Sequence, residues 1–541
     1  MYTAALSSDT GLHRHSYAQK ETTGDHMKIT YATMNAEDEE LQAAYDAGVV
    51  EARAQLGQTH AFWINGEPRT SPNTFDEYSP IDNDLLIGAY AQATPDDVDD
   101  AVDAARAAQP AWEKTPWQDR VALMHKAADI LDERLMSVSA LLGFEVGKSR
   151  LEALGDVAET SEFLRYYAKQ MEDHDGFVIP LNALASNERN VSVLRPYGVW
   201  AVISPFNFPL ALAAGGSIGA MLTGNTVVLK PSNPGALAAL VFYRLMADAG
   251  LPDGVLNVVT GGDDVGRALV EADVDGITFT GSYDVGMSIY HNFADRVPKP
   301  VIAEMGGKNP AIVTASANLD EAAEGVARGA FGFSGQKCSA TSRVYVEESV
   351  FDEFVAKLVS FTEELEVSNP IEREAFTGPV IDEAAVERYL AAVKEVSHAG
   401  GRILTGGEAL EDEDLQAGNY VAPTVATVDE SSWVWDRELF VPFVVVGKVE
   451  SLDEALDKAN DTDFGLTAGL FSRDQAEIEK FFDRIEAGVT YVNRRAGATT
   501  GAWPDIQSFG GWKGSGTSGA GGGGPWYLRS YLREQSRTIF T

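Results

Sequence analysis

The sequence of 541 residues contains a single cysteine, Cys338. One cysteine excludes an intrachain disulfide and fits a reducing compartment, so we expect a cytoplasmic protein. A lone cysteine in a long chain is more often a buried small hydrophobe than a nucleophile. Cys338 taken alone therefore leaves both interpretations open.

Basic residues are also scarce, since 42 Lys and Arg stand against 81 Asp and Glu, for a net charge of −39. Phosphate and anionic lipid need a basic face, so we expect neither nucleic acid nor a membrane surface as a partner. The acids occur in many segments, such as 94–102 and 408–418, and do not form a tail. In concentrated salt, screening removes their self-repulsion. This composition predicts a halophilic protein.

One uncharged stretch, residues 208–229, is long enough to cross a bilayer. Four glycines interrupt it, and its last third reads as a separate buried strand, so we expect no membrane span. The first 29 residues lack the apolar core of a secretory signal. We expect Met27 to be the natural start and leave residues 1–26 out of the fold prediction.

The pattern from about residue 36 to 170 is mainly helical, and 187–203 shows the β-branched alternation of strands. Strands and helices then alternate over 198–294 and again over 299–474. Such alternation predicts parallel strands with crossover helices, and hence an α/β protein with two doubly wound lobes. The glycine-rich run 511–525 is open to interpretation as a flexible linker.

Five short segments combine small residues with one reactive group at the end of an expected strand, where α/β folds place their sites. Each alone has an ordinary explanation, such as a turn asparagine, a surface lysine or turn glycines. Their occurrence in order at successive α/β units predicts an active site. The segments are SPFNFP with Asn207, LKPSNPG with Lys230, FTGSYDVG with Ser282, AEMGGKNP with Glu304, and GQKCSA with Cys338.

These motifs, followed by ELFVPFVVV at 438–446 and FGGWKGSG at 509–516, resemble those of the aldehyde dehydrogenase superfamily from about residue 47 to the C-terminus. The resemblance implies a Rossmann-like cofactor domain, a catalytic domain and a small β arm that joins subunits of a homo-oligomer. The implied boundaries are 1–46 for a leader and lead-in helix, 47–176 and 196–303 for the dinucleotide-binding domain, 177–195 and 525–541 for the arm, and 304–524 for the catalytic domain.

The resemblance makes Cys338 the nucleophile that attacks an aldehyde. It implies that the Asn207 amide and the Cys338 backbone N–H hold the resulting oxyanion, at roughly 3 kcal/mol per donor. Glu304 would be the general base that activates water to hydrolyse the thioester. This base favours a free acid product over transfer to coenzyme A. No metal is implied.

The resemblance also implies a nicotinamide cofactor, with Lys230 at the adenosine ribose, Ser282 at the pyrophosphate and Glu438 at the nicotinamide ribose. Asn233 stands where the family often has a carboxylate, so NAD is expected and nothing at this position repels NADP. Val441 replaces the usual glycine of E-x-F-G-P. The expected cofactor residues are Ile203, Ser204, Pro205, Phe206, Lys230, Asn233, Gly281, Ser282, Gly286, Glu438 and Phe440.

Within the family, the sequence most resembles the branch that oxidises glutamate γ-semialdehyde in proline degradation. A T-G-A loop of that branch, here Thr500, Gly501 and Ala502, would bind the substrate carboxylate through backbone N–H groups. Ser339 would add a hydrogen bond, and Phe208 and Phe509 would enclose the aliphatic part. The alternatives are 2-oxoglutarate or succinate semialdehyde, cofactor-independent ester hydrolysis by the same thiol, and a catalytically silent protein on this fold.

The acidic composition gives a first testable prediction. We expect the unfolding temperature to rise steeply from dilute buffer to molar potassium chloride, because the Debye length shrinks to about 3 Å at 1 M salt. Calorimetry over a salt series measures this dependence. Equal stability in dilute buffer would contradict the halophilic interpretation.

Overall fold

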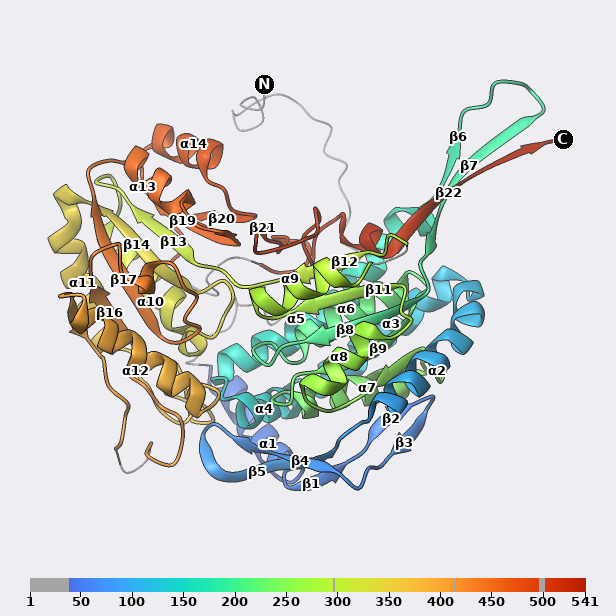
Figure 1. Ribbon diagram of the computed structural model, residues 1–541, viewed down its shortest axis with the longest axis horizontal. Coiled ribbons are helices and arrows are strands. Elements are labelled where there is room, and N and C mark those ends of the chain that lie inside the picture. The colour runs from blue at the N-terminus through green and yellow to red at the C-terminus, as the bar shows by residue number, and fades with distance from the viewer. Residues whose placement is uncertain (1–37, 295–296, 413–414, 496–501) are drawn as a thin grey trace.

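The computed structural model describes residues 38–294, 297–412, 415–495 and 502–541. The expected leader 1–26, Thr500 and Gly501 lie outside these residues. Two seven-stranded sheets form the centres of two lobes (Figure 1). The prediction of two doubly wound α/β lobes is confirmed.

The first sheet has the order β12-β11-β8-β9-β10-β2-β3, parallel from β12 to β10 and antiparallel at β2 and β3. Its register pairs Thr280 with Glu304 and Ile203 with Lys230, so four strands end along one edge. The strands are β2 (Phe62–Ile64), β3 (Glu67–Arg69), β8 (Val199–Ser204), β9 (Thr226–Pro231), β10 (Leu256–Val258), β11 (Gly276–Thr280) and β12 (Val301–Glu304).

The helices of this lobe precede or alternate with its strands. Helix α2 starts with a capping box between Thr94 and Asp97 and with Pro95 in its first turn, as its sequence predicts. The helices are α1 (Glu39–Arg53), α2 (Pro95–Lys114), α3 (Trp117–Glu133), α4 (Leu135–Val146), α5 (Arg150–Asp173), α6 (Ala211–Leu222), α7 (Ala236–Ala249), α8 (Asp263–Glu271) and α9 (Tyr283–Asn292).

The uncharged stretch 208–229 divides into the buried helix α6 and part of strand β9, and does not form one long helix. In the part of the chain that the structure describes, no helix combines the length and the apolar character needed to cross a bilayer.

The second sheet has the order β15-β16-β17-β14-β13-β19-β20 and is parallel except for β15. Its strands are β13 (Asn309–Val313), β14 (Thr341–Glu347), β15 (Arg402–Thr405), β16 (Thr424–Thr427), β17 (Phe443–Val449), β19 (Thr467–Phe471) and β20 (Val489–Val492). Its helices are α10 (Leu319–Phe331), α11 (Phe351–Glu363), α12 (Glu383–His398), α13 (Leu452–Asn460) and α14 (Gln475–Arg484).

Three small sheets complete the fold. One contains β1 (Gln58–His60), β5 (Asp82–Ala91) and β4 (Thr74–Ser79), and another pairs β18 (Phe464–Gly465) with β21 (Trp512–Lys513). The third contains β6 (Val178–Leu181), β7 (Glu188–Pro196) and β22 (Leu532–Phe540), and it projects from the body as an arm (Figure 1).

The prediction that 36–170 is mainly helical is wrong for residues 58–91, which form strands β1 to β5. These strands are short, and β3 and β4 are largely exposed, so they carry little apolar alternation. The Asn65-Gly66 turn between β2 and β3, with both residues at positive φ, was the sequence signal for a hairpin.

Candidate active site

A cleft of about 1240 Å³ lies at the carboxyl ends of the strands of the first sheet and reaches Cys338 in the second lobe. It brings together most of the residues that the sequence singles out. The predicted residues that line it are Ile203, Ser204, Pro205, Phe206, Asn207, Lys230, Gly281, Ser282, Glu304, Cys338, Glu438 and Phe440.

Cys338 lies on a turn that follows α10 and a short 3₁₀ segment, Gly332–Gly335. Phe333, Ser334 and Gly335 have φ values of 50°, 52° and 67°, so the chain reverses through three left-handed residues. The Ser334 N–H donates to the Thr377 hydroxyl at 2.7 Å, which holds this strained reversal in place.

Asn309 holds the other side of the nucleophile turn. Its amide group donates to the carbonyls of Cys338 and Ala340 at 2.7 and 2.9 Å, and its side-chain oxygen accepts the Thr467 N–H at 3.1 Å. The sequence prediction did not single out Asn309, although it follows Lys308 in the GGKNP motif. Its role is to fix the backbone that carries the thiol.

The thiol of Cys338 is protonated at rest. Burial raises its pKa to about 12, and the nearby carboxylates of Glu438 and Glu304 add to this effect. Backbone N–H groups of Ser339 and Cys338 act in the opposite direction but do not offset the burial. Since the thiolate is the reactive form, the site needs a base to take this proton.

Glu304 ends strand β12 and lines the same cleft. Its Oε2 accepts the Gly511 N–H at 3.2 Å, and its buried Oε1 has no hydrogen-bond partner among the described residues. Burial raises the pKa of this carboxyl to about 8. A carboxyl group with that pKa can act as a base in neutral to slightly alkaline solution.

The glycine-rich run 511–525 packs against the end of β12 and is not a flexible linker, so that interpretation is wrong. Ser515 accepts the Met305 N–H at 2.8 Å and donates through its hydroxyl to the Gly306 carbonyl at 2.7 Å. The Thr517 hydroxyl accepts the Ala303 N–H at 2.9 Å. These bonds fix the strand end that places Glu304.

Asn207 is 2% exposed and follows Phe206 in the loop after β8. The Phe206 ring meets the Phe440 ring edge to face, with centroids 5.9 Å apart. This contact joins the loops of the two lobes across the cleft. The role of Asn207 as oxyanion donor stays a prediction.

The cofactor half of the cleft has the chemistry that a dinucleotide needs. Lys230 is the penultimate residue of β9, where burial lowers its pKa and the charges of Asp263 and Asp264 oppose that shift. Ser282 stands at the N-cap of α9 without a side-chain capping bond, so the helix N-terminus is open to an anion.

Two buried polar atoms of predicted cofactor residues, Ser204 Oγ and Asn233 Oδ1, have no hydrogen-bond partner in the part of the chain that the structure describes, although Asn233 itself does not line the cleft. Buried polar groups are normally paired, so these atoms suit a polar ligand. Gly286 does not line the cleft, and a Cβ there would lie 2.5 Å from Met305 Sδ. It allows α9 to approach the segment that follows Glu304.

Glu438 contacts the segment that follows Glu304. Its Oε1 accepts the Gly307 N–H at 3.0 Å, and burial raises its pKa to about 7. The left-handed residue of this loop is Phe440, with φ of 57°, and not Val441. The valine therefore replaces the family's glycine without strain at its own position.

The predicted substrate residues are placed in part. Ser339 is 8% exposed, and its carbonyl accepts the Thr467 hydroxyl at 3.3 Å. Phe509 exchanges two backbone hydrogen bonds with Gly522, at 2.9 and 2.7 Å. Ala502 is half-buried. Since Thr500 and Gly501 lie outside the described residues, carboxylate binding by this loop stays a prediction.

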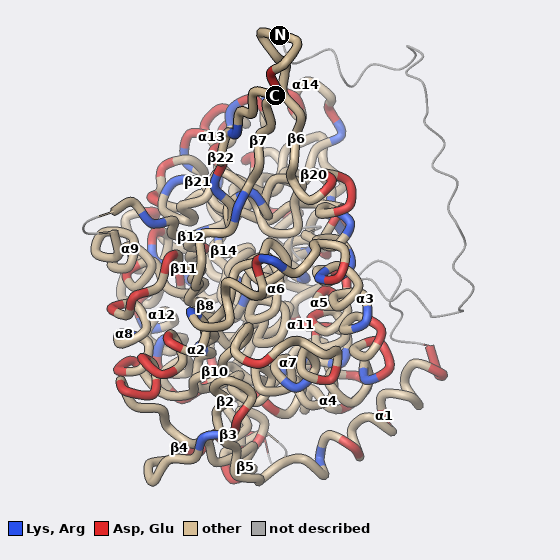
Figure 2. Tube along the Cα trace, turned by 90° about the vertical axis from the view of Figure 1, so that its right-hand side faces the viewer, with Lys and Arg blue, Asp and Glu red and all other residues tan. Residues whose placement is uncertain are grey.

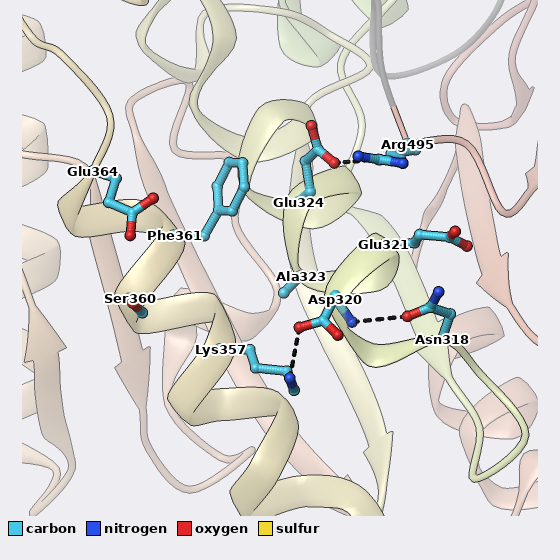
Figure 3. A pocket seen from close by; sticks show the side chains of 10 residues that line it. All are labelled: Asn318, Asp320, Glu321, Ala323, Glu324, Lys357, Ser360, Phe361, Glu364 and Arg495. Carbon is cyan, nitrogen blue, oxygen red and sulfur yellow. Dashed lines mark hydrogen bonds and ion pairs between the residues drawn. The ribbon is translucent and has the colours of Figure 1, made fainter.

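A second hollow of about 450 Å³ lies between α10 and α11 (Figure 3). The predicted site residues that the structure describes do not line it. Its cations already have partners, since Lys357 pairs with Asp320 at 2.5 Å and Arg495 pairs with Glu324. No group of three or more potential metal ligands occurs within the described ranges.

The model of the aldehyde dehydrogenase family matches residues 67–536. The chain belongs to this family. Among its curated relatives is a 1-pyrroline-5-carboxylate dehydrogenase from Halalkalibacterium halodurans, 38% identical over 95% of this chain and 98% of the relative.

Solved structures agree with the family assignment. The 1-pyrroline-5-carboxylate dehydrogenase from Thermus with bound NAD has a TM-score of 0.90 and 33% identity, over 96% of this chain and 100% of that one. Proline utilization A from Bdellovibrio bacteriovorus has a TM-score of 0.87 and 37% identity. That match covers 92% of this aldehyde dehydrogenase chain and 52% of the Bdellovibrio protein.

The raised pKa of Glu304 gives a prediction for hydrolysis of the acyl-enzyme. We expect the rate of this step to rise with pH through about 8, because only the carboxylate can take a proton from water. In Glu304→Gln we expect a hydrolysis rate that does not change with pH and is lower by at least about 100-fold. We also expect a burst of one reduced cofactor per active site, because the acyl-enzyme then accumulates. Rapid-mixing kinetics measures both.

Glu438→Gln is the matched control, because Glu438 is also a buried carboxyl in this cleft, with a pKa of about 7. In Glu438→Gln, the pH profile of acyl-enzyme hydrolysis should keep its inflection near 8. An unchanged inflection in Glu304→Gln would remove Glu304 from the role of base.

Proposed function

We propose that this protein oxidises L-glutamate γ-semialdehyde to L-glutamate in proline degradation, in a reducing cytoplasm. The main support is that Cys338 and Glu304 line one cleft, in a chain whose near full-length relatives are 1-pyrroline-5-carboxylate dehydrogenases. A catalytically silent protein would have no need for a thiol in the same cleft as a buried carboxyl oxygen that has no hydrogen-bond partner among the described residues.

In the proposed reaction, the Glu304 carboxylate takes the proton of Cys338 and passes it to solvent, and the sulfur bonds to the aldehyde carbon. Asn207 and the Cys338 N–H hold the oxygen, which becomes negative as the carbonyl double bond opens. The nicotinamide, when bound, supplies the hydride acceptor that turns the adduct into a thioester. Glu304 then takes a proton from water, the water oxygen bonds to the acyl carbon, and the C–S bond breaks to release the acid.

Lys230, Ser282 and Glu438 are the residues that would hold the dinucleotide. NAD is the cofactor bound in the Thermus relative, which supports NAD here. Asn233 is neutral where the family often has a carboxylate, so a 2′-phosphate meets no charge at that residue. We therefore propose NAD as the main cofactor and NADP as an accepted one.

For the substrate, we propose that Thr500, Gly501 and Ala502 bind the carboxylate, with Ser339 beside the nucleophile and Phe208 and Phe509 around the aliphatic chain. The two backbone bonds between Phe509 and Gly522 support a rigid Phe509. The same residues would also bind a shorter or more oxidised acidic semialdehyde. Substrate identity therefore needs a direct comparison.

Steady-state kinetics in high salt tests this proposal. We expect kcat/KM for glutamate γ-semialdehyde to exceed that for propanal by at least about 100-fold, since a carboxylate bound by several donors is a charge-assisted contact. Succinate and 2-oxoglutarate semialdehydes, each with NAD and NADP, complete the comparison.

Cys338→Ala is the control and should abolish turnover. Retained turnover would overturn the mechanism, and parity with propanal would overturn the carboxylate site. Turnover of esters with no oxidation of any of these aldehydes, with NAD or with NADP, would instead favour ester hydrolysis as the function.

We propose that the arm formed by β6, β7 and β22 pairs with a second copy of the chain. Its large apolar side chains are exposed in one subunit, with Ile179 at 54%, Ile539 at 50% and Phe540 at 66%. The arm projects away from the body (Figure 1), so the subunit itself leaves these side chains uncovered. Exposed apolar surface of this kind is typical of a subunit interface.

A double variant tests the arm. Ile539→Asp with Phe540→Asp should convert the oligomer to monomers, because each interface would bury two unpaired carboxylates. Light scattering after size exclusion measures the mass. Glu534→Asp on the same strand, which keeps the charge, should leave the mass unchanged, and an unchanged oligomer in the double variant would exclude the arm.

The acidic surface supports our proposal of adaptation to high salt. In Figure 2 the acidic positions lie over many outer helices and do not gather at one place. We also retain the domain boundaries implied by the sequence as a proposal, with the cofactor domain at 47–176 and 196–303 and the catalytic domain at 304–524.

A further inference from the structure

Lys148 is a fully buried cation, with 0% of its side chain exposed. It lies between α4 and α5, and its Nζ forms an ion pair with Asp156 at 3.0 Å. Removing two charges from water is unfavourable, and apolar side chains of similar size often replace such a pair without loss of stability. The contacts of Lys148 therefore indicate what the charge does.

The Lys148 ammonium contacts two aromatic rings from different loops. Its Nζ lies 3.6 Å from the centroid of the Phe208 ring and 5.0 Å from that of Phe333. Phe208 directly follows Asn207, and Phe333 begins the left-handed reversal that leads to Cys338. One cation thus lies between the loop of the proposed oxyanion donor and the loop of the nucleophile. Cation–π contacts of this kind strengthen when they are desolvated.

Asp156 connects the pair to the Asn207 loop a second time. Its Oδ1 accepts the N–H of Ala211, the first residue of α6, at 2.8 Å. The loop is therefore held by Asp156 where α6 begins and by Lys148 at the Phe208 ring.

Helix α5 also contacts the Cys338 loop, one helical turn before Asp156. Glu152 pairs with Lys337, the residue before Cys338, at 2.5 Å. The i and i+4 spacing of Glu152 and Asp156 places both carboxylates on the same face of α5. The helix is thus a common support for both loops.

We propose that Lys148 is a positioning residue that sets the Asn207 loop and the Cys338 loop relative to each other, with Asp156 holding its charge. This inference rests on the proposed function, because it acts through the oxyanion donor and the nucleophile. It assigns the buried pair to catalysis and not to stability of the fold.

The first test is Lys148→Met, which keeps the length of the side chain and removes the charge. We expect kcat for aldehyde oxidation to fall about 10- to 100-fold, since a misplacement of about 1 Å costs on that order. KM should change less. The cofactor-free hydrolysis of p-nitrophenyl acetate should fall in parallel, because it uses the same sulfur and oxyanion donor. Rates are expressed per reactive Cys338, measured by alkylation.

Lys148→Met combined with Asp156→Asn separates positioning from stability. The double variant removes both charges, and the amide oxygen still accepts the Ala211 N–H. We expect its unfolding temperature to return toward that of the unchanged protein while kcat stays low, because the contacts of the cation with Phe208 and Phe333 are lost. Recovery of kcat together with stability would overturn the proposal.

Arg120→Met is the matched control. Arg120 is 7% exposed and donates to the Leu222 carbonyl at 2.8 Å, at the other end of α6. This variant should lower the unfolding temperature while kcat per active site stays unchanged. A fall in kcat like that of Lys148→Met would show that loss of any buried cation that supports α6 has this effect, and would overturn a specific role for Lys148.

A double-mutant cycle with Asn207→Ala tests the route of the effect. In the Asn207→Ala background, Lys148→Met should lower the ester hydrolysis rate by less than about 2-fold. If Lys148→Met lowered this rate by the same factor as it does in the unchanged protein, the proposal would be contradicted. Unchanged kcat in Lys148→Met beside an inactive Cys338→Ala would overturn this inference alone. Turnover by Cys338→Ala would instead overturn the proposed function.

Discussion

Burial of ionisable groups is the constraint on which the active site depends. Cys338, Glu304 and Glu438 share one cleft, and burial raises the pKa of all three, to about 12, 8 and 7. Lys148 and Lys337 pair with carboxylates of α5, and the charge of buried Lys308 only partly opposes the effect of burial on Glu438. The resting site therefore keeps the proton on its thiol, and the chemistry begins only when that proton has an acceptor.

This burial requires the two lobes and the C-terminal segment together. The strand that ends at Glu304 belongs to the first sheet, and Cys338 lies on the turn before β14 of the second. Residues 511–517 bond across to the segment around Glu304. Asn309 then fixes the nucleophile turn to β19 through Thr467. The active site thus lies where backbone segments from both lobes and from the C-terminal region meet. The groups that fix these segments are accordingly amides, hydroxyls and glycines.

Charge is distributed in opposite ways inside and outside the molecule. The acidic positions are spread along many elements of the chain (Figure 2), and charges exposed to water are screened by salt. In the interior, Lys148 and Lys337 each have one carboxylate partner, whereas Lys308 has no hydrogen-bond partner among the described residues and burial lowers its pKa to about 7. The net charge of −39 therefore says little about the chemistry of the cleft.

The sequence by itself determined the class of fold and which residue types could carry the chemistry. Parallel strands end at one edge, so the motifs of Asn207, Lys230, Ser282 and Glu304 had to converge once the strand–helix alternation was recognised. The hairpin at 62–69 was missed because short, exposed strands leave little apolar pattern, although Asn65-Gly66 marked its turn.

Only the tertiary structure decided what surrounds each reactive group. The pKa of Glu304 and of Cys338, the hold of Asn309 on the nucleophile turn, and the place of Lys148 between two aromatic rings all depend on residues far apart in the chain. Desolvation and long-range contacts have no period or spacing in a sequence, so a motif can name Cys338 as a nucleophile but cannot show how its proton is held.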